Sequence, residues 1–201
     1  MNIGPNLESL VRSIAPIRIL GRNLNLESIS NHQITDQYLG WLRNKEVNKF
    51  LEFDKDQITF EAVVSYINSL RSRENCDLLA VTSNDDGRHI GNISITELSK
   101  ETGHATYGIM IGEKSDPLAN IAGSEATLLI IDYLFSFDFI SQIHEGAHIE
   151  NKRASSLLRK IGFLPLSDAP DDQDIQRYFL TKTEWLERST RFSSMFKPNN
   201  H

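Results

Sequence analysis

The stretch GIMIGEKSDPLANIAGSEATLLIIDYL, from Gly108 to Leu134, decides the fold of this chain. It begins with a short apolar run bounded by glycines, which is typical of a buried strand. A loop with an Asp-Pro dipeptide follows, and from Gly123 onward apolar residues recur at helical spacing. The first amides of a helix have no intrahelical partner, and the helix dipole favours negative charge there. The stretch therefore predicts an anion-binding strand, loop and helix, with a plain turn as the alternative.

Strand and helix patterns occupy most of the remaining chain. Strands are expected at 17–29 (one strand interrupted at Gly21), 78–82, 90–97, 105–112, 142–150, 163–166 and 177–183. Helices are expected within 38–53 (short ones), at 59–73, from 123 onward and at 151–161. The expected N-caps are Thr59, Asn151 and, as the alternative to a phosphate contact, Ser124, and Gly162 follows the end of the helix at 151–161. This order predicts one α/β (α+β) domain, in which a mostly antiparallel, twisted sheet of about six or seven strands is flanked by helices. We expect it to span residues 17–185, with an N-terminal appendage at 1–16 and a C-terminal tail at 186–201.

The composition narrows the classes of function. The 201 residues carry a formal net charge of −6, which argues against general nucleic-acid binding. Cys76 is the only cysteine and the six histidines are scattered, so we expect neither an internal disulfide nor a metal site. The N-terminus lacks the pattern of a signal peptide, and no run approaches the roughly 20 apolar residues of a membrane span. A cytoplasmic protein without a membrane or nucleic-acid partner is therefore expected.

Three segments in this order resemble the GCN5-related N-acetyltransferase (GNAT) superfamily. They are the strand–loop–helix described above, the helix NKRASSLLRKIGF at 151–163, and the pair GRNLNLESIS and YLGWLRNKEVNKFLEF near the N-terminus. The combination is most similar to the branch that holds the acetyltransferases of ribosomal-protein N-termini and of nucleotide-linked amino sugars. The resemblance implies a sheet splayed at its middle and acetyl transfer from acetyl-CoA to a primary amine.

The resemblance also implies which residues meet the two substrates. Backbone groups of Ile109 and Ile111 would hold the pantetheine arm and the thioester, and Asn151 would approach the same arm. The loop amides that would bind the pyrophosphate belong to Asn120, Ile121, Ala122, Gly123, Ser124 and Glu125, and the Ser124 hydroxyl could add a contact. The residues placed in or near the acceptor pocket are Tyr38, Trp41 and Tyr107, each with a role in the core as the alternative.

Acetyl transfer needs a base, because an alkylammonium group is mostly protonated at pH 7 and only the neutral amine attacks. His148 is the first candidate since imidazole titrates near neutrality. A structural or surface histidine is the alternative. Glu150 and Glu97 are further candidates, although Glu150 could instead complement the start of the following helix and Glu97 could be a solvated strand end.

The acceptor expected first is a nucleotide-linked amino sugar, and the alternative is the N-terminus of a (ribosomal) protein. Ile121, Ala154 and Leu158 stand where relatives often have a glycine, a serine and a tyrosine. These departures favour a third interpretation, a GNAT-like protein that binds a ligand or partner without catalysis. Because relatives often pair, a homodimer is one expected assembly.

Overall fold

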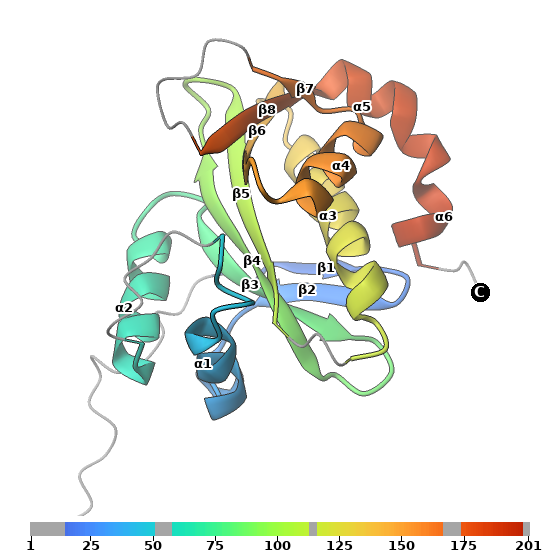
Figure 1. Cartoon of the computed structure of the whole chain (residues 1–201). Coiled ribbons are helices and arrows are strands. Elements are labelled where there is room, and N and C mark those ends of the chain that lie inside the picture. The colour runs from blue at the N-terminus through green and yellow to red at the C-terminus, as the bar shows by residue number, and fades with distance from the viewer. Residues whose placement is uncertain (1–14, 51–57, 113–115, 167–173, 199–201) are drawn as a thin grey trace, which may run out of the picture.

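The computed structural model describes residues 15–50, 58–112, 116–166 and 174–198, and its centre is a twisted sheet (Figure 1). The strands are β1 (Arg18–Leu20), β2 (Leu24–Ser28), β3 (Asp77–Ser83), β4 (His89–Leu98), β5 (His104–Ile111), β6 (Gln142–His148), β7 (Leu164–Pro165) and β8 (Ile175–Thr181). The helices are α1 (Asp36–Arg43), α2 (Phe60–Arg71), α3 (Ala119–Phe135), α4 (Lys152–Ile161), α5 (Lys182–Arg188) and α6 (Ser193–Phe196), with 3-10 turns at Asn31–Gln33 and Ser189–Arg191.

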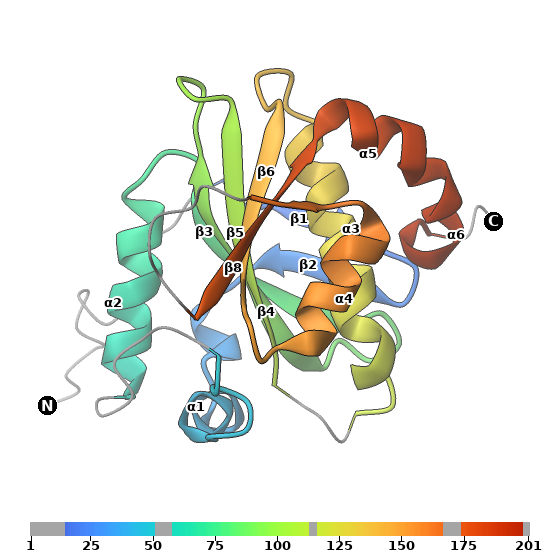
Figure 2. The same cartoon turned by 45° about the horizontal axis from the view of Figure 1, so that its top comes forward.

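Helices cover both faces of this sheet. Figure 2 shows α1 and α2 on one side and α3, α4, α5 and α6 on the other. Two groups of buried apolar residues correspond to these layers, one built with the side chains of α3 and α4 and the other with those of α1 and α2. The predicted single α/β domain is thus confirmed.

The eight described strands lie in the order β1-β2-β3-β4-β5-β6-β8-β7, and only β5 and β6 run parallel. That parallel pairing covers three residue pairs and ends at Thr106 opposite His144. Beyond this point β5 stays paired with β4, and β6 stays paired with β8 as far as His148 opposite Ile175. The sheet therefore splays between β5 and β6, as expected.

The prediction of one interrupted strand at 17–29 was wrong, because this segment folds back as the hairpin β1–β2. Gly21 makes the turn. Its N–H donates to the Leu24 carbonyl at 2.9 Å, and a Cβ at Gly21 would lie 2.4 Å from that same oxygen. Only glycine can bring the backbone so close, which explains why the sheet has one strand more than the expected upper number.

The C-terminal segment packs against the domain as far as residue 196, beyond the domain boundary expected at residue 185. Phe196 is buried, and its carbonyl accepts from the Arg22 N–H at 3.0 Å. Trp185 is also buried and donates its indole N–H to Asp132 of α3 at 3.2 Å. Most of the expected N-terminal appendage, residues 1–14, lies outside the described residues.

Candidate active site

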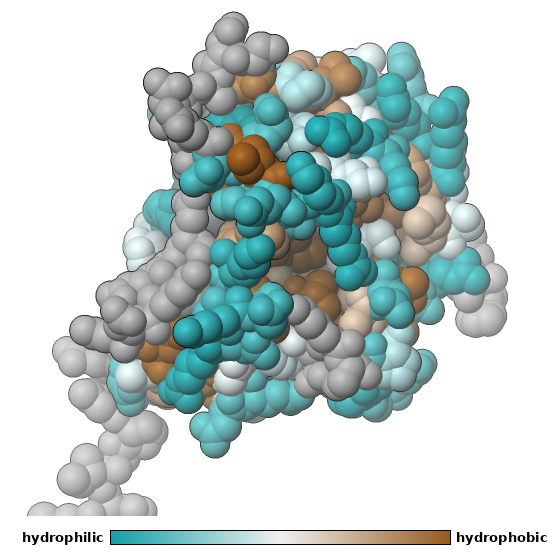
Figure 3. Space-filling view, viewed as in Figure 1, coloured by the Kyte–Doolittle hydropathy of each residue, from teal (hydrophilic) through white to brown (hydrophobic). Residues whose placement is uncertain are grey.

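A cavity of about 530 Å³ lies where β5 and β6 separate. Aromatic and aliphatic side chains of α1 and α2 form one wall, and Asn92, Ser94 and Thr96 of β4 form a polar row on its floor. In Figure 3, apolar residues fill a recess near the centre of the molecule, with hydrophilic residues around it. This arrangement suits a ligand that has both apolar and polar parts.

Unpaired polar atoms gather in this cavity. Among the described residues, four buried side-chain atoms have no hydrogen-bond partner: His89 Nδ1, Asn92 Oδ1, the Tyr107 hydroxyl and Glu145 Oε2. Three of these four residues, Asn92, Tyr107 and Glu145, line the cavity. Since buried polar groups in proteins are nearly always paired, this concentration indicates a site that a ligand completes.

The unpaired groups lie on both faces of the sheet. Side chains alternate along a strand, so Glu145 shares a face of β6 with Ile143, which packs in the core beneath α3 and α4. Tyr107 belongs to the same core. Asn92 pairs with Met110, whose side chain packs in the core beneath α1 and α2. The cavity therefore connects the two faces through the gap between β5 and β6.

Burial controls the ionisation of the two groups at the closed end of this gap. It raises the pKa of the Glu145 carboxyl well above its usual range, and no other cause contributes to the shift. Burial also raises the pKa of the Tyr107 hydroxyl, and the neighbouring Glu145 raises it further. Burial thus favours the neutral form of both groups, in which each can donate a hydrogen bond.

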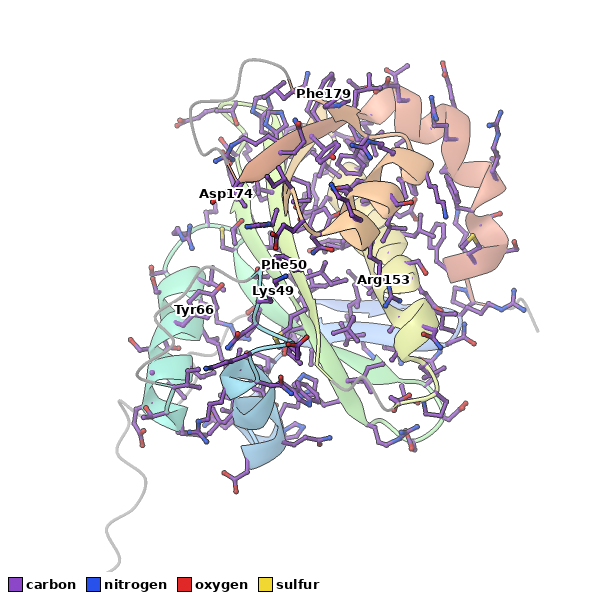
Figure 4. All side chains as sticks on the ribbon, viewed as in Figure 1. Lys49, Phe50, Tyr66, Arg153, Asp174 and Phe179 are labelled. Atoms are coloured by element: carbon purple, nitrogen blue, oxygen red, sulfur yellow. The ribbon has the colours of Figure 1, made fainter. Side chains whose placement is uncertain are left out.

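Of the three predicted catalytic residues, only His148 lines the cavity. Its ring lies 5.0 Å from the Phe50 ring, and its Nδ1 accepts from the Glu150 N–H at 3.2 Å. Phe50 extends across the cavity from the segment after α1 (Figure 4). This position keeps His148 available to an acceptor.

Glu150 and Glu97 lie outside the cavity lining. The Glu150 carboxylate forms an exposed ion pair with Lys49 at 3.0 Å, and this hydrogen bond lowers its pKa. Glu97 accepts weakly from Thr106 at 3.4 Å and borders a separate, shallow depression near Cys76. The structure therefore places these two carboxylates outside the cavity that His148 lines, and their catalytic role stays a prediction.

The predicted pyrophosphate loop is part of a helix. Helix α3 begins at Ala119 rather than at Gly123, because Asp116 organises the preceding turn. The Asp116 side chain accepts from the Leu118 N–H at 2.8 Å, and its carbonyl accepts from the Ala119 N–H at 2.9 Å. Asp116 in turn forms an ion pair with Arg88. The anion-binding end of this helix is thus several residues earlier than predicted.

Four of the six residues predicted to bind the pyrophosphate consequently lie beyond the first three residues of the helix, where their amides bond to carbonyls. The Ala122 N–H donates to the Leu118 carbonyl at 2.8 Å, and Gly123, Ser124 and Glu125 lie deeper in the helix, where amides bond to carbonyls four residues earlier. The Ser124 hydroxyl donates to the Ile121 carbonyl at 2.8 Å. The prediction that Ser124 caps this helix was therefore wrong.

The remaining two positions, Asn120 and Ile121, lie in the first turn of α3. The Ile121 N–H donates to the Leu118 carbonyl at 2.9 Å. Arg153 of α4 reaches across to this turn and donates to the Asn120 carbonyl at 3.3 Å (Figure 4). The N-terminus of α3 thus carries both its own dipole and an arginine, and sequence reasoning missed the arginine's position.

Other predicted contacts divide between the cavity and the core. Ile109, Tyr38 and Tyr107 line the cavity, whereas Ile111 packs in the core beneath α3. Trp41 packs against Gly112, and a Cβ added at Gly112 would lie 2.0 Å from the Trp41 ring. Trp41 is therefore a core residue, which was the alternative to a role in the acceptor pocket.

Asn151 directly precedes helix α4. It is the N-cap of α4, and its side chain accepts from the Ala154 N–H at 3.1 Å. The capping expectation is confirmed, and the predicted approach to the CoA arm stays a prediction.

Glu145 is the functional candidate that sequence reasoning missed. The signal was present in the sequence: Ile143, Glu145 and Ala147 alternate as the inward residues of a strand, so a carboxylate stands at an apolar position. A buried carboxylate needs a partner or a function. Its proximity to Tyr107 could be found only from the pairing of β5 with β6.

The described residues hold neither a metal cluster nor a membrane-spanning helix. No group of three or more histidine, cysteine, aspartate or glutamate side chains could hold a metal ion. None of the helices is long and apolar enough to cross a membrane.

Comparison with known proteins gives a family and a fold. The model of the acetyltransferase (GNAT) domain family matches residues 23–164. The solved structure of apo FdhC, a nucleotide-linked sugar GNAT, is 17% identical with a TM-score of 0.71, and the match covers 89% of this chain and 98% of that one. A GCN5-related N-acetyltransferase from Brucella melitensis is 16% identical with a TM-score of 0.71, covering 92% of this chain and 87% of that one.

A third solved structure contains ligands. Spermidine N-acetyltransferase from Vibrio cholerae, in complex with CoA and spermine, is 15% identical with a TM-score of 0.69, and the match covers 82% of this chain and 98% of that one. At these identities the three structures show a shared fold. No curated protein matches the sequence.

Proposed function

This chain belongs to the GNAT acetyltransferase family and is an acetyl-CoA-dependent N-acetyltransferase, and we propose that its acceptor is the amino group of a nucleotide-linked amino sugar. The observation that carries this proposal is the lining of the cavity between β5 and β6, which offers aromatic, hydroxyl and cationic groups to the acceptor. Two arguments support it, one for each substrate.

The residues present fit acetyl-CoA. The open end of the splay meets the N-terminus of α3, where Arg153 adds a positive charge suited to phosphate groups. From there, the edge of β5 that faces β6 has no strand partner in the described register, including at Ile109. The backbone N–H and C=O groups of this edge can therefore form hydrogen bonds to the extended pantetheine arm of acetyl-CoA. The closed end holds the unpaired Tyr107 and Glu145. Acetyl-CoA, when bound, supplies the acetyl group as a thioester.

The acceptor side of the cavity favours a hydroxylated, anionic molecule over a polycation. Tyr38 and Tyr66 offer aromatic faces, and Asn92 and Ser94 offer polar contacts. Arg177 supplies a positive charge at the same wall. Among the described lining residues, the one carboxyl is Glu145, and burial raises its pKa and so favours its neutral form. A polyamine would need several carboxylates here, whereas a sugar nucleotide brings hydroxyls, a base and phosphates.

We assign the proton transfer to His148. During the reaction the amine nitrogen bonds to the acyl carbon and the carbon–sulfur bond breaks, with its electron pair moving to sulfur. The nitrogen loses one proton and the sulfur gains one. His148 is the one imidazole among the described lining residues, so it can accept the proton from the amine.

A thiol-release assay with acetyl-CoA tests the acceptor. The panel contains UDP- and dTDP-linked amino sugars, peptides with free N-termini, and spermidine. We expect turnover with an amino-sugar nucleotide at a kcat/KM at least about tenfold above the other classes, which corresponds to one well-made polar contact. Preferred turnover of the peptides would identify a protein acetyltransferase instead. Binding of acetyl-CoA in calorimetry without any turnover would support a binding protein.

A matched pair of variants locates the anionic part of the acceptor. Arg177→Ala removes the exposed cation at the cavity wall, and Arg191→Ala removes an exposed cation far along the chain. We expect Arg177→Ala to raise KM for the sugar nucleotide about tenfold and to leave KM for acetyl-CoA unchanged. An equal KM in both variants would contradict the proposed contact.

The cytoplasmic location and the homodimer stay predictions. Size-exclusion chromatography with light scattering would give the assembly state.

A further inference from the structure

Glu145 lies at the apex of the splay. The last hydrogen-bonded register pair of β5 and β6 is Thr106 with His144, and the next residues on the two strands are Tyr107 and Glu145. Both end in a buried polar atom without a partner among the described residues, and both line the cavity. The narrowest part of the gap is therefore walled by two polar groups, of which Tyr107 has the Thr127 hydroxyl as a polar neighbour and the Glu145 Oε2 has no hydrogen-bond partner.

The groups around Glu145 are uncharged. Tyr107 faces it from β5, and Tyr178 stands opposite it on β8. The Tyr178 hydroxyl is occupied, because it accepts from Arg159 of α4 at 3.2 Å. Thr127 of α3 lies beside Tyr107, and its hydroxyl donates to the Gly123 carbonyl at 2.7 Å.

Arg159 of α4 contacts Tyr178 on the same face as Glu145, whereas three further titratable groups nearby lie on the opposite face of the sheet. His144 and His148 alternate with Glu145 along β6 and point away from it. Arg177 pairs with Gly146 and so lies on that same opposite face. Burial is accordingly the one cause of the raised pKa of the carboxyl, and it favours the protonated form.

The direction in which acetyl-CoA enters is fixed by the two ends of the gap. The anion-binding end is the start of α3 with Arg153, which follows the open end of β5. An arm anchored there would run along Ile109 toward the apex, and Tyr107 and Glu145 would then meet its acyl end. This step rests on the proposed function.

We propose that Glu145 is a neutral carboxylic acid that donates a hydrogen bond, together with the Tyr107 hydroxyl, to the carbonyl oxygen of the acyl group. Negative charge develops on this oxygen while the nitrogen–carbon bond forms and the carbon–sulfur bond breaks. The hydrogen bonds stabilise that charge, and no proton is transferred to the oxygen. Donors fixed in a water-poor site stabilise developing charge strongly, and a carboxyl kept neutral by an apolar environment can serve as such a donor.

The first test measures protonation of Glu145 in the ligand-free protein. Infrared difference spectroscopy at pH 7 compares the wild type with Glu145→Gln, and Glu101→Gln is the control for an exposed carboxyl. We expect a protonated-carboxyl C=O band that disappears in Glu145→Gln and remains in Glu101→Gln. A wild-type spectrum without such a band would overturn the proposal, whatever the enzymatic activity.

The second test separates a donor from a base. Glu145→Gln keeps a donor of the same shape, whereas Glu145→Leu removes it. We expect kcat of Glu145→Leu to fall about 100-fold, the usual loss for one donor to a developing oxyanion, while Glu145→Gln stays within about tenfold of the wild type. Equal, severe losses in both variants would overturn the proposal, because they would require an ionisable carboxyl. Unchanged kcat in both would overturn it as well.

Binding measurements distinguish this inference from the proposed function. Calorimetry with acetyl-CoA on the wild type tests the cofactor site by itself. If acetyl-CoA does not bind, the proposed function fails and this inference fails with it. If acetyl-CoA binds to the wild type and to both Glu145 variants, and these variants turn over at the wild-type rate, only the role of Glu145 is refuted. Circular dichroism of each variant confirms that it is folded.

Discussion

Two glutamates of this protein, the buried Glu125 and the partly buried Glu145, have opposite surroundings. Glu125 lies in the second turn of α3, where its carboxylate accepts from the Asn23 N–H and side-chain amide at 2.7 Å each and from the Leu24 N–H at 3.2 Å. Glu145 lies at the apex of the splay, and its Oε2 has no partner among the described residues. Both are carboxyls removed from water, yet only one of them has its hydrogen bonds made.

The comparison shows that hydrogen-bond partners within the protein, rather than burial or residue type, separate a structural carboxyl group from a candidate functional one. Three donors compensate the cost of burying the Glu125 carboxylate, so it joins α3 to the start of β2. The missing partner of Glu145 must come from a ligand, or the site would only destabilise the fold. Sequence reasoning named Glu125 for its position near a predicted loop and passed over Glu145.

The largest expected effect comes from removing the satisfied acid. Glu125→Leu leaves two backbone N–H groups and an amide without an acceptor, and each such loss costs about 1–3 kcal/mol. We expect the free energy of unfolding to fall by about 3 kcal/mol in urea titrations. Glu187→Leu, an exposed position on α5, is the control and should change it by less than about 0.5 kcal/mol. A loss of the same small size at Glu125 would remove the distinction between the two glutamates.

The second expected effect is an increase in the free energy of unfolding. Glu145→Leu replaces an unpaired buried acid with an apolar side chain, so we expect the free energy of unfolding to rise by about 1–2 kcal/mol. This gain would accompany the loss of kcat. A decrease in stability would show that Glu145 has partners that hold the fold together.

The pH dependence of stability sharpens the same comparison. Because burial raises the pKa of Glu145, the folded protein holds a proton that the unfolded chain releases above about pH 4.3. The wild type should therefore lose stability relative to Glu145→Gln as the pH rises from about 4.3 toward the raised pKa. Urea titrations of both proteins between these limits measure the difference. A difference that stays constant with pH would mean that the carboxyl is ionised in the folded state.

Much of the fold was predictable because its signals are local. Thr59 and Asn151 cap their helices as predicted, and Gly162 ends α4 with a φ of 121° that favours glycine. The start of α3 was not predictable in this way, because its N-cap is Leu118, which makes no side-chain cap bond. The turn there depends on Asp116 and on its ion pair with the distant Arg88.

The site was less predictable because it depends on which strands meet. His148, Tyr38, Tyr107 and Ile109 could be named from the family resemblance, and all four line the cavity. The isolation of Glu145 follows from the three-pair register between β5 and β6, which no local pattern encodes. The hydrogen-bond partners of the two glutamates could not be derived from the sequence, and these partners decide the roles of both residues.

The smallest expected effect tests whether the comparison extends to a neutral group. Tyr107→Phe removes a buried hydroxyl that has no partner, so the free energy of unfolding should change by less than about 0.5 kcal/mol. If this hydroxyl bonds the acyl oxygen, kcat should still fall about tenfold, since a neutral hydrogen bond contributes about 1 kcal/mol. Tyr178→Phe is the matched control, because that hydroxyl already accepts from Arg159. Its loss should reduce stability more than Tyr107→Phe does and leave kcat closer to the wild-type value. If instead Tyr107→Phe lowered stability more and kcat less than Tyr178→Phe, the Tyr107 hydroxyl would have no role in catalysis. The proposed stabilisation of the acyl oxygen would then depend on Glu145 alone.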